Sequence, residues 1–168
     1  MNLEVLGVAD ACHAVREIRL GRPGGGTLPP YTPGSHLVVG RNAYSLTGSG
    51  AVSTEYRVSV LLRPDGAGGS ARMHRLSAGD LVEASGPRSM FPPVLSARRH
   101  LLVAGGIGIT PILSHVRAAL LWDRRFTVLY GHRPGFAAHL EELRALCGGR
   151  LLTDPVRELL PRLLAAQP

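Results

Sequence analysis

The chain has 168 residues, of which 45% are hydrophobic and 18% charged. This length suits one domain or two small halves, and the hydrophobic fraction excludes a disordered chain. No apolar run approaches the ~20 residues of a membrane-spanning helix, and the N-terminus lacks the basic-then-apolar pattern of a signal peptide. We therefore expect a soluble, cytoplasmic protein without membrane contacts.

The charge balance is basic, with a net charge of +7 and 19 arginines but no lysine. Such a balance can indicate nucleic-acid binding. Here the arginines are scattered, apart from the pairs Arg98–Arg99 and Arg124–Arg125, and aromatic residues do not alternate with them. We therefore expect no nucleic-acid partner, and the charge suits anionic small molecules or an acidic protein partner.

Metal-binding patterns are missing from the sequence. Cys12 and Cys147 stand far apart and outside any Cys-x-x-Cys spacing, and the seven histidines also lack metal-ligand spacing. Two such cysteines cannot build an iron–sulfur cluster or a structural zinc site. We predict no metal, so any redox chemistry must come from an organic cofactor.

Residues 1–98, called the β half below, have the pattern of an antiparallel β-barrel. Short alternating segments are separated by turns rich in Gly and Pro. Before the last strand, Ser70 is expected to cap a short helix over 70–76. The expected strands are 2–9, 14–21, 35–40, 43–48, 55–63 and 81–86.

Residues 99–168, called the α/β half, change to a β-α-β-α-β-α order. Strand 101–104 is wholly apolar, as expected when helices cover both faces of a parallel sheet. This order predicts a shortened parallel sheet of the nucleotide-binding type, with right-handed crossovers. The other expected elements are strands 126–131 and 150–153 and helices 110–121, 137–147 and 156–166.

A glycine-rich segment, GGIGITP at 105–111, directly follows the apolar strand and opens a helix. Glycines at this place let a phosphate-bearing ligand approach backbone amides at the helix N-terminus. Pro111 stands where the dinucleotide fingerprint has its third glycine. Because a proline is also favourable in the first turn of a helix, an ordinary tight turn is an equal interpretation.

Two segments of the β half add candidate ligand contacts. RNAYSL at 41–46 combines an arginine for a phosphate, a tyrosine for a flat aromatic ring and a serine for a ring nitrogen. GAGGS at 66–70 can form a cradle of backbone amides for an anion. Each segment alone is also typical of an ordinary strand or loop.

These segments, in this order, strongly resemble the ferredoxin-reductase superfamily, most closely reductases of the phthalate dioxygenase reductase and vanillate demethylase reductase type. The resemblance runs from about Met1 to the C-terminus. It implies a flavin on the barrel, usually FMN rather than FAD in this branch, and NADH or NADPH on the α/β half. The residues that carry it are YSL at 44–46, YRVSVLL at 56–62, GAGGS at 66–70, GDLVEASGPRSMFP at 79–92 and LLVAGGIGITP at 101–111.

The resemblance also implies roles for individual residues. Tyr44 packs on the flavin ring, and Ser45 faces its reactive N5 edge. Gly68–Ser70 hold the flavin phosphate, nicotinamide meets the flavin beside Thr110, and Arg133 faces the adenosine end of the nucleotide. Ser45 and Thr110 are the implied catalytic residues. The implied cofactor-binding residues are Arg41, Asn42, Tyr44, Ser45, Leu46, Gly68, Gly69, Ser70, Gly105, Gly106, Gly108, Thr110 and Arg133.

Three departures from the family pattern are visible. Asn42 stands where the family has its arginine, and strand alternation points Arg41 to the opposite face. The family's two-iron ferredoxin domain is absent, so a separate ferredoxin or the oxygenase must accept electrons. The chain ends before the strand with the family's Cys-Gly-Pro motif, which leaves strand 101–104 with an unpaired edge.

That edge needs a cover, and we expect helix 156–166, a second copy of the chain or another partner to supply it. The helix has an apolar stripe, but Pro161 predicts a kink or an early stop. The stripe consists of Val156, Leu159, Leu160, Leu163 and Leu164.

Two functions remain as hypotheses. The first is a flavin-dependent NAD(P)H oxidoreductase that supplies an oxygenase system. The second keeps the fold without redox chemistry, as a non-redox natural-product enzyme in a vacated flavin cleft or as a binding or regulatory subunit. Other polar residues are expected to be ordinary: Glu141, Glu142 and Arg144 on a solvated helix face, and the isolated histidines His36, His74, His115 and His139 satisfied or exposed rather than catalytic.

Overall fold

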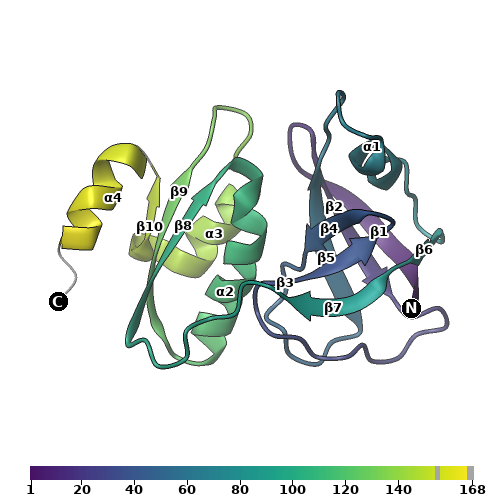
Figure 1. Cartoon of the computed structure of the whole chain (residues 1–168), viewed down its shortest axis with the longest axis horizontal. Coiled ribbons are helices and arrows are strands. Elements are labelled where there is room, and N and C mark those ends of the chain that lie inside the picture. The colour runs from purple at the N-terminus through teal and green to yellow at the C-terminus, as the bar shows by residue number, and fades with distance from the viewer. Residues whose placement is uncertain (154–155, 166–168) are drawn as a thin grey trace.

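A computed structural model describes residues 1–153 and 156–165 of this chain. Within them the predicted architecture is confirmed, with antiparallel sheets first and a parallel sheet second (Figure 1). The larger antiparallel sheet has the order β5-β2-β1-β6, and the smaller has the order β4-β3-β7. The strands are β1 (Asn2–Cys12), β2 (Val15–Gly21), β3 (Ser35–Val39), β4 (Asn42–Ser45), β5 (Glu55–Leu61), β6 (Leu81–Glu83) and β7 (Ser85–Ser89).

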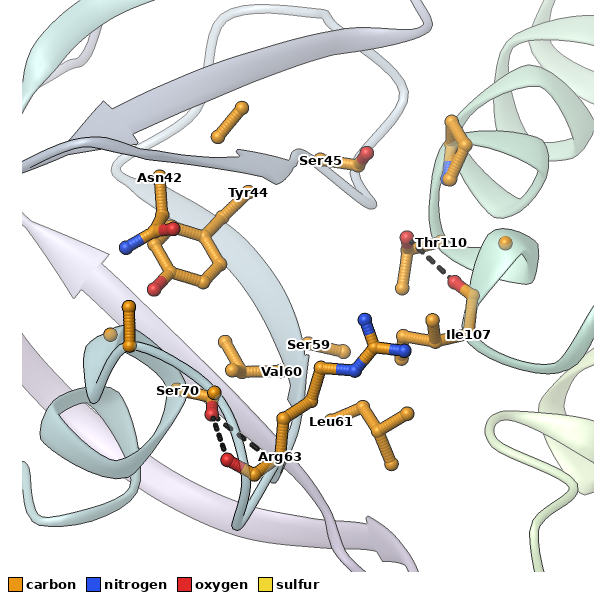
Figure 2. A pocket seen from close by; sticks show the side chains of 16 residues that line it. Asn42, Tyr44, Ser45, Ser59, Val60, Leu61, Arg63, Ser70, Ile107 and Thr110 are labelled. Atoms are coloured by element: carbon orange, nitrogen blue, oxygen red, sulfur yellow. Dashed lines mark hydrogen bonds between the residues drawn. The ribbon is translucent and has the colours of Figure 1, made fainter.

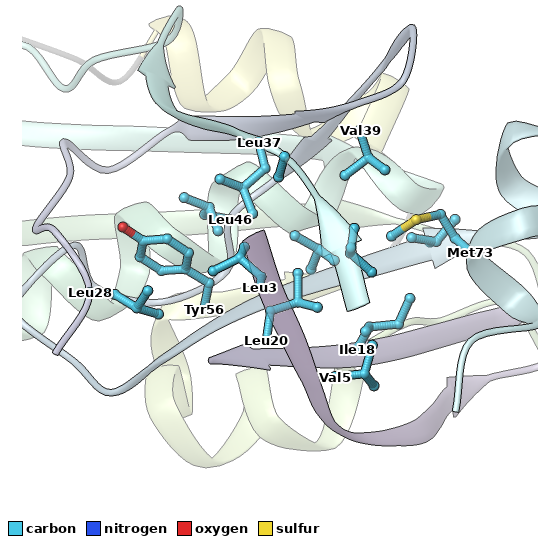
Figure 3. Packing of buried hydrophobic residues seen from close by; sticks show 14 residues of the cluster. Leu3, Val5, Ile18, Leu20, Leu28, Leu37, Val39, Leu46, Tyr56 and Met73 are labelled. Atoms are coloured by element: carbon cyan, nitrogen blue, oxygen red, sulfur yellow. The ribbon is translucent and has the colours of Figure 1, made fainter. Parts of the chain in front are cut away.

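The two antiparallel sheets of the β half enclose one apolar core. An isolated bridge between Leu46 and Val58 links them, so the described residues do not form one continuously hydrogen-bonded barrel. Figure 3 shows Leu3, Leu37 and Tyr56 meeting in this core. Alternate β5 residues, among them Tyr56 and Val58, point into it, which directs Ser59 toward the α/β half.

The α/β half contains a three-stranded parallel sheet in the order β10-β9-β8. Helices α2 and α3 lie on the side of this sheet that faces the β half, and α4 lies on the far side (Figure 1). The elements are β8 (Arg99–Gly105), α2 (Ile109–Leu121), β9 (Arg125–Gly131), α3 (Leu140–Cys147), β10 (Leu151–Thr153) and α4 (Val156–Ala165), with short 3₁₀ turns at Gly106–Gly108 and Gly148–Arg150.

Two expected helix starts are wrong, for reasons of backbone conformation. Helix α1 spans Gly69–His74, and its N-cap is Gly68 with φ of 83° rather than Ser70. The Ser70 hydroxyl instead accepts a hydrogen bond from the Arg63 amide at 3.0 Å. Helix α3 begins three residues later than predicted, because His139 has a φ of 58° and cannot continue a helix.

The predictions for the last helix and for strand 101–104 also need correction. Helix α4 continues through Pro161 to Ala165 rather than stopping early, and residue 166 lies outside the described residues. The helix lies against β9, where Val156 is close to Gly131, so it does not cover the β8 edge. The face of β8 that carries Val103 is only partly covered, since this side chain is 37% exposed.

No helix within the described ranges has the length and apolar character needed to cross a membrane.

Candidate functional site

A cavity of about 480 Å³ lies between the two halves of the chain (Figure 2). Its volume is typical of small-molecule sites. The β half contributes its residues from β4, β5 and the loop before α1, and the α/β half contributes the start of α2. The lining residues are Asn42, Ala43, Tyr44, Ser45, Ser59, Val60, Leu61, Arg63, Gly66, Ala67, Gly69, Ser70, Ile107, Gly108, Thr110 and Pro111.

Strand β4 places an aromatic ring and an amide on one face of the cavity. Asn42 and Tyr44 are two residues apart, so their side chains share a face of the strand. The loop before α1 passes close to both: a Cβ on Gly69 would lie 2.1 Å from Asn42 Nδ2 and 3.4 Å from the Tyr44 hydroxyl. A side chain at position 69 would therefore displace the exposed Asn42 amide. Burial raises the pKa of Tyr44, so its phenol stays protonated at neutral pH.

The opposite wall is the turn from β8 into α2. A 3₁₀ turn at Gly106–Gly108 leads directly into the helix. The Thr110 hydroxyl donates a hydrogen bond to the Ile107 carbonyl at 3.0 Å. Figure 2 shows Thr110 and Ser45 on facing walls of the cavity. The two halves therefore each present a hydroxyl to the same space.

Arg63 is a cavity residue that the sequence reasoning missed. Its side chain extends from the end of β5 toward Ile107 (Figure 2). Arg41, which the RNAYSL segment offered as a phosphate contact, lies outside the cavity lining. The pairing of Val39 with Asn42 leaves Arg41 in the turn between β3 and β4, so it is not on the strand as expected. Arg63 is the arginine that lines this cavity.

A second, larger cavity of about 1110 Å³ lies at the carboxyl ends of β8 and β9. Its lining contains Gly105, Gly106 and Arg133 of the predicted nucleotide site. His13, Arg63 and His132 also line it, and among the residues that the structure describes no acidic side chain does. The second cavity shares Arg63 and Ile107 with the first, so the two are adjacent.

The structure brings most of the predicted site residues to these two cavities. Leu46 is a core residue with no exposed surface, and Gly68 caps α1 without lining either cavity. These placements locate the residues, and their ligand roles stay predictions. The first cavity contains Asn42, Tyr44, Ser45, Gly69, Ser70, Gly108 and Thr110, and the second contains Gly105, Gly106 and Arg133.

The described part of the chain has no group of three or more His, Cys, Asp or Glu side chains arranged to hold a metal ion.

No family model matches the chain, but comparison with known proteins finds relatives. It is 39% identical over 132 residues to the heme-dependent oxidative N-demethylase beta subunit of Ectopseudomonas mendocina, covering 74% of this chain and 43% of that protein. It is 37% identical over 124 residues to the carnitine monooxygenase reductase subunit of Escherichia coli, covering 68% of this chain and 39% of that one.

Among solved structures, phthalate dioxygenase reductase superposes with a TM-score of 0.86 and 31% sequence identity. The match covers 92% of this chain and 51% of that one. The chain thus spans about two-fifths of the length of the two curated relatives and about half of the solved structure.

Proposed function

Because this chain belongs to the ferredoxin-reductase superfamily and is related to reductase subunits of oxygenase systems, we propose that it carries the flavin-binding and nicotinamide-nucleotide-binding part of such a reductase. Residues 1–98 are assigned to the flavin and residues 99–168 to the nucleotide. The observation that carries this proposal is the cavity lined from both halves, with Tyr44 and Ser45 opposite Thr110. The non-redox alternative has no comparable observation in its favour.

The residues of the first cavity fit a flavin. Tyr44 offers a ring face, Gly69 brings the backbone before α1 close to the Tyr44 hydroxyl, and Arg63 offers a positive charge. A flavin held there would supply hydride acceptance from NADH or NADPH and the release of single electrons. In this assignment Ser45 and Thr110 orient the reacting rings from the two walls, and they are the catalytic residues we propose.

We assign FMN rather than FAD to the first cavity, with its phosphate near Gly68, Gly69 and Ser70. The nucleotide is assigned to the second cavity, where Gly105 and Gly106 leave space beside the backbone and Arg133 supplies a charge for the adenosine end. The electron acceptor is assigned as a separate ferredoxin or oxygenase component. We place the protein in the cytoplasm, since its proposed electron donor is a soluble nucleotide.

The first test is the visible spectrum of the purified chain, followed by titration with FMN and FAD. Flavin bands near ~370 and ~450 nm that bleach with NADH or NADPH under anaerobic conditions are the expected result. Flavin that binds without bleaching would show that hydride transfer needs residues outside this chain. A colourless protein that binds neither flavin would overturn the proposal.

Tyr44→Ala is expected to weaken FMN binding about tenfold, because ring packing of this kind contributes roughly 0.5–1.5 kcal/mol beyond the buried area. Tyr44→Phe keeps the ring and is expected to bind FMN within about threefold of the unchanged chain, since a 0.6 kcal/mol difference is of that size. Fluorescence titration measures both. Equal weakening in the two variants would mean that the hydroxyl, rather than the ring, contacts the flavin.

We also propose that a second copy or the electron-transfer partner covers the β8 edge, since within residues 1–153 and 156–165 β8 is paired only with β9 and its Val103 is exposed. Light scattering across a concentration series is expected to show a dimer. Val103→Glu is expected to shift the equilibrium toward monomer without changing the circular dichroism spectrum. A chain that stays monomeric at all concentrations would contradict the homodimer, and the electron-transfer partner would then be the proposed cover of the β8 edge.

A further inference from the structure

Helix α2 carries a polar stripe that is hydrogen-bonded to the β half. Thr110, Ser114 and Arg117 follow the i, i+4, i+7 spacing of one helix face. The Ser114 hydroxyl, which is fully buried, donates to the Gly48 carbonyl at 2.6 Å. Arg117 donates to the Thr47 carbonyl, also at 2.6 Å. Thr47 and Gly48 follow Ser45 closely in the chain. Helix α2 is therefore hydrogen-bonded to the segment directly after Ser45, which lines the cavity.

A second connection joins α3 to β5 beside the same cavity. His139 Nε2 lies 2.8 Å from the Ser59 hydroxyl, and His139 Nδ1 lies 3.2 Å from Glu142 Oε2. Because a carboxylate only accepts, we assign the ring proton to Nδ1, so that Nε2 accepts the hydrogen bond from Ser59. Glu142 also pairs with Arg117. One continuous path therefore runs from β5 through α3 and α2 to Thr47.

The backbone at His139 indicates that this connection is constrained by its surroundings. His139 has a φ of 58°, in the left-handed region that residues other than glycine adopt uncommonly. Such a conformation persists where the surrounding structure holds it. Both ring nitrogens are hydrogen-bonded, and the residue is only 9% exposed. The ring is therefore held between the two halves rather than free in solvent.

The order Ser59, His139, Glu142 is also that of a hydrolase triad, but the surroundings do not suit hydrolysis. Ser59 lies inside β5, opposite Glu17 of β2, and is 5% exposed. Its hydroxyl is occupied by His139 on the buried side of the strand. Ser59 also lines the first cavity, which we assign to a flavin, so the three side chains are better explained as a structural connection.

We propose that Ser114, Arg117 and His139 are positioning residues that fix the spacing between the Ser45 and Thr110 walls. The proposal rests on the proposed reductase function, because this spacing sets how closely nicotinamide approaches the flavin. Thr110 lies one helical turn before Ser114, so any tilt of α2 moves Thr110 directly. Hydride transfer requires reacting atoms about 3–3.5 Å apart, and a misplacement of about 1 Å can cost roughly 100-fold in rate.

The kinetic test uses three variants and one matched control. Ser114→Ala and Ser59→Ala each remove one hydroxyl, and His139→Asn tolerates the left-handed backbone but is too short to reach Ser59. Glu141→Gln is the control, since Glu141 is a highly exposed neighbour of Glu142. Each of the three variants is expected to reduce flavin at least tenfold more slowly at saturating NADH. FMN affinity is expected to stay within about threefold of the unchanged chain in Ser114→Ala and His139→Asn, whose positions do not line the flavin cavity. Glu141→Gln is expected to show the same rate of flavin reduction and the same FMN affinity as the unchanged chain.

Rescue separates positioning from general damage. Ser59→Thr keeps the hydroxyl and is expected to recover most of the rate that Ser59→Ala loses. The KM for NADH is expected to move less than the first-order rate of flavin reduction. Unchanged reduction rates in Ser114→Ala and His139→Asn would overturn the positioning proposal and leave the reductase function standing.

A calorimetric test needs no flavin, so it remains decisive if the reductase function fails. The unchanged chain is expected to unfold in one transition, because the hydrogen bonds couple the two halves. The Ser114→Ala/His139→Asn double variant is expected to unfold in two separate transitions, whereas Glu141→Gln keeps one. A single transition at an unchanged temperature in the double variant would show that these residues do not fix the two halves together.

Discussion

Replacing Gly34 by alanine is expected to lower the free energy of unfolding by about 3 kcal/mol. Gly34 has a φ of 81°, and a Cβ there would lie 2.0 Å from the Phe91 carbonyl oxygen and 2.8 Å from His115 Nε2. The left-handed backbone costs an L side chain about 1 kcal/mol, and overpacking adds roughly 1–3 kcal/mol because a backbone carbonyl cannot rotate away. For a chain of this size the melting temperature is expected to fall by roughly 6–12 °C.

Gly24→Ala is the matched control for this effect. Gly24 has a φ of 76°, but a Cβ there would meet nothing within 4 Å. It therefore tests the backbone cost alone, about 1 kcal/mol. Urea unfolding of both variants gives the comparison. If Gly34→Ala lowers the free energy of unfolding no more than Gly24→Ala does, the Phe91 carbonyl does not lie close to Gly34.

The Gly34→Ala substitution is also expected to disturb a contact between the two halves, which Phe91 and His115 form. His115 is on α2, and its Nε2 atom lies 3.0 Å from the Phe91 carbonyl oxygen. The His115 and Phe91 rings pack edge-on with centroids 4.9 Å apart. Burial lowers the pKa of His115, so the ring is neutral at pH 7 and its Nε2 proton is available to donate to this carbonyl. Moving Phe91 therefore breaks a contact that joins α2 to the segment after β7.

The order of the elements was predictable because it depends on local patterns. Apolar residues at 101–104, followed by glycines and a helical period, predict the turn from β8 into α2 wherever the rest of the chain lies. Arg41 shows where such reasoning stops. Its place depends on whether the turn after β3 takes two residues, which is set by the pairing of Val39 with Asn42 and not by the residue types.

The contacts between the halves could not be predicted from the sequence. Ser59 and His139 are 80 residues apart, and neither has a local signal that pairs it with the other. His139 is hydrogen-bonded through both ring nitrogens, but the sequence did not identify its partners. The expectation of a solvated helix face holds for Glu141 and Arg144, which form an exposed ion pair, but not for Glu142, which turns toward Arg117.

Glu142→Gln is expected to destabilise the chain by about 1–2 kcal/mol at pH 7. The hydrogen bond from His139, together with the charge of Arg117, lowers the pKa of Glu142 from its ordinary 4.5 to about 2, although burial opposes this shift. Each pKa unit corresponds to about 1.4 kcal/mol, and we reduce the resulting sum because the side chain is 35% exposed and partly screened by solvent. Glutamine keeps the shape of the side chain and loses the charge.

The pH dependence follows from the direction of that pKa shift. Because the folded chain holds the Glu142 proton more weakly than the unfolded chain, the stabilisation is complete above about pH 4.5 and is lost as the pH falls toward about 2. The difference between the unchanged chain and Glu142→Gln is therefore expected to shrink over that interval. Urea unfolding at pH 7, 5, 4 and 3 measures it, with Glu141→Gln as the exposed control. A difference that stays constant down to pH 3 would show that the Glu142 charge does not stabilise the contact between α2 and α3.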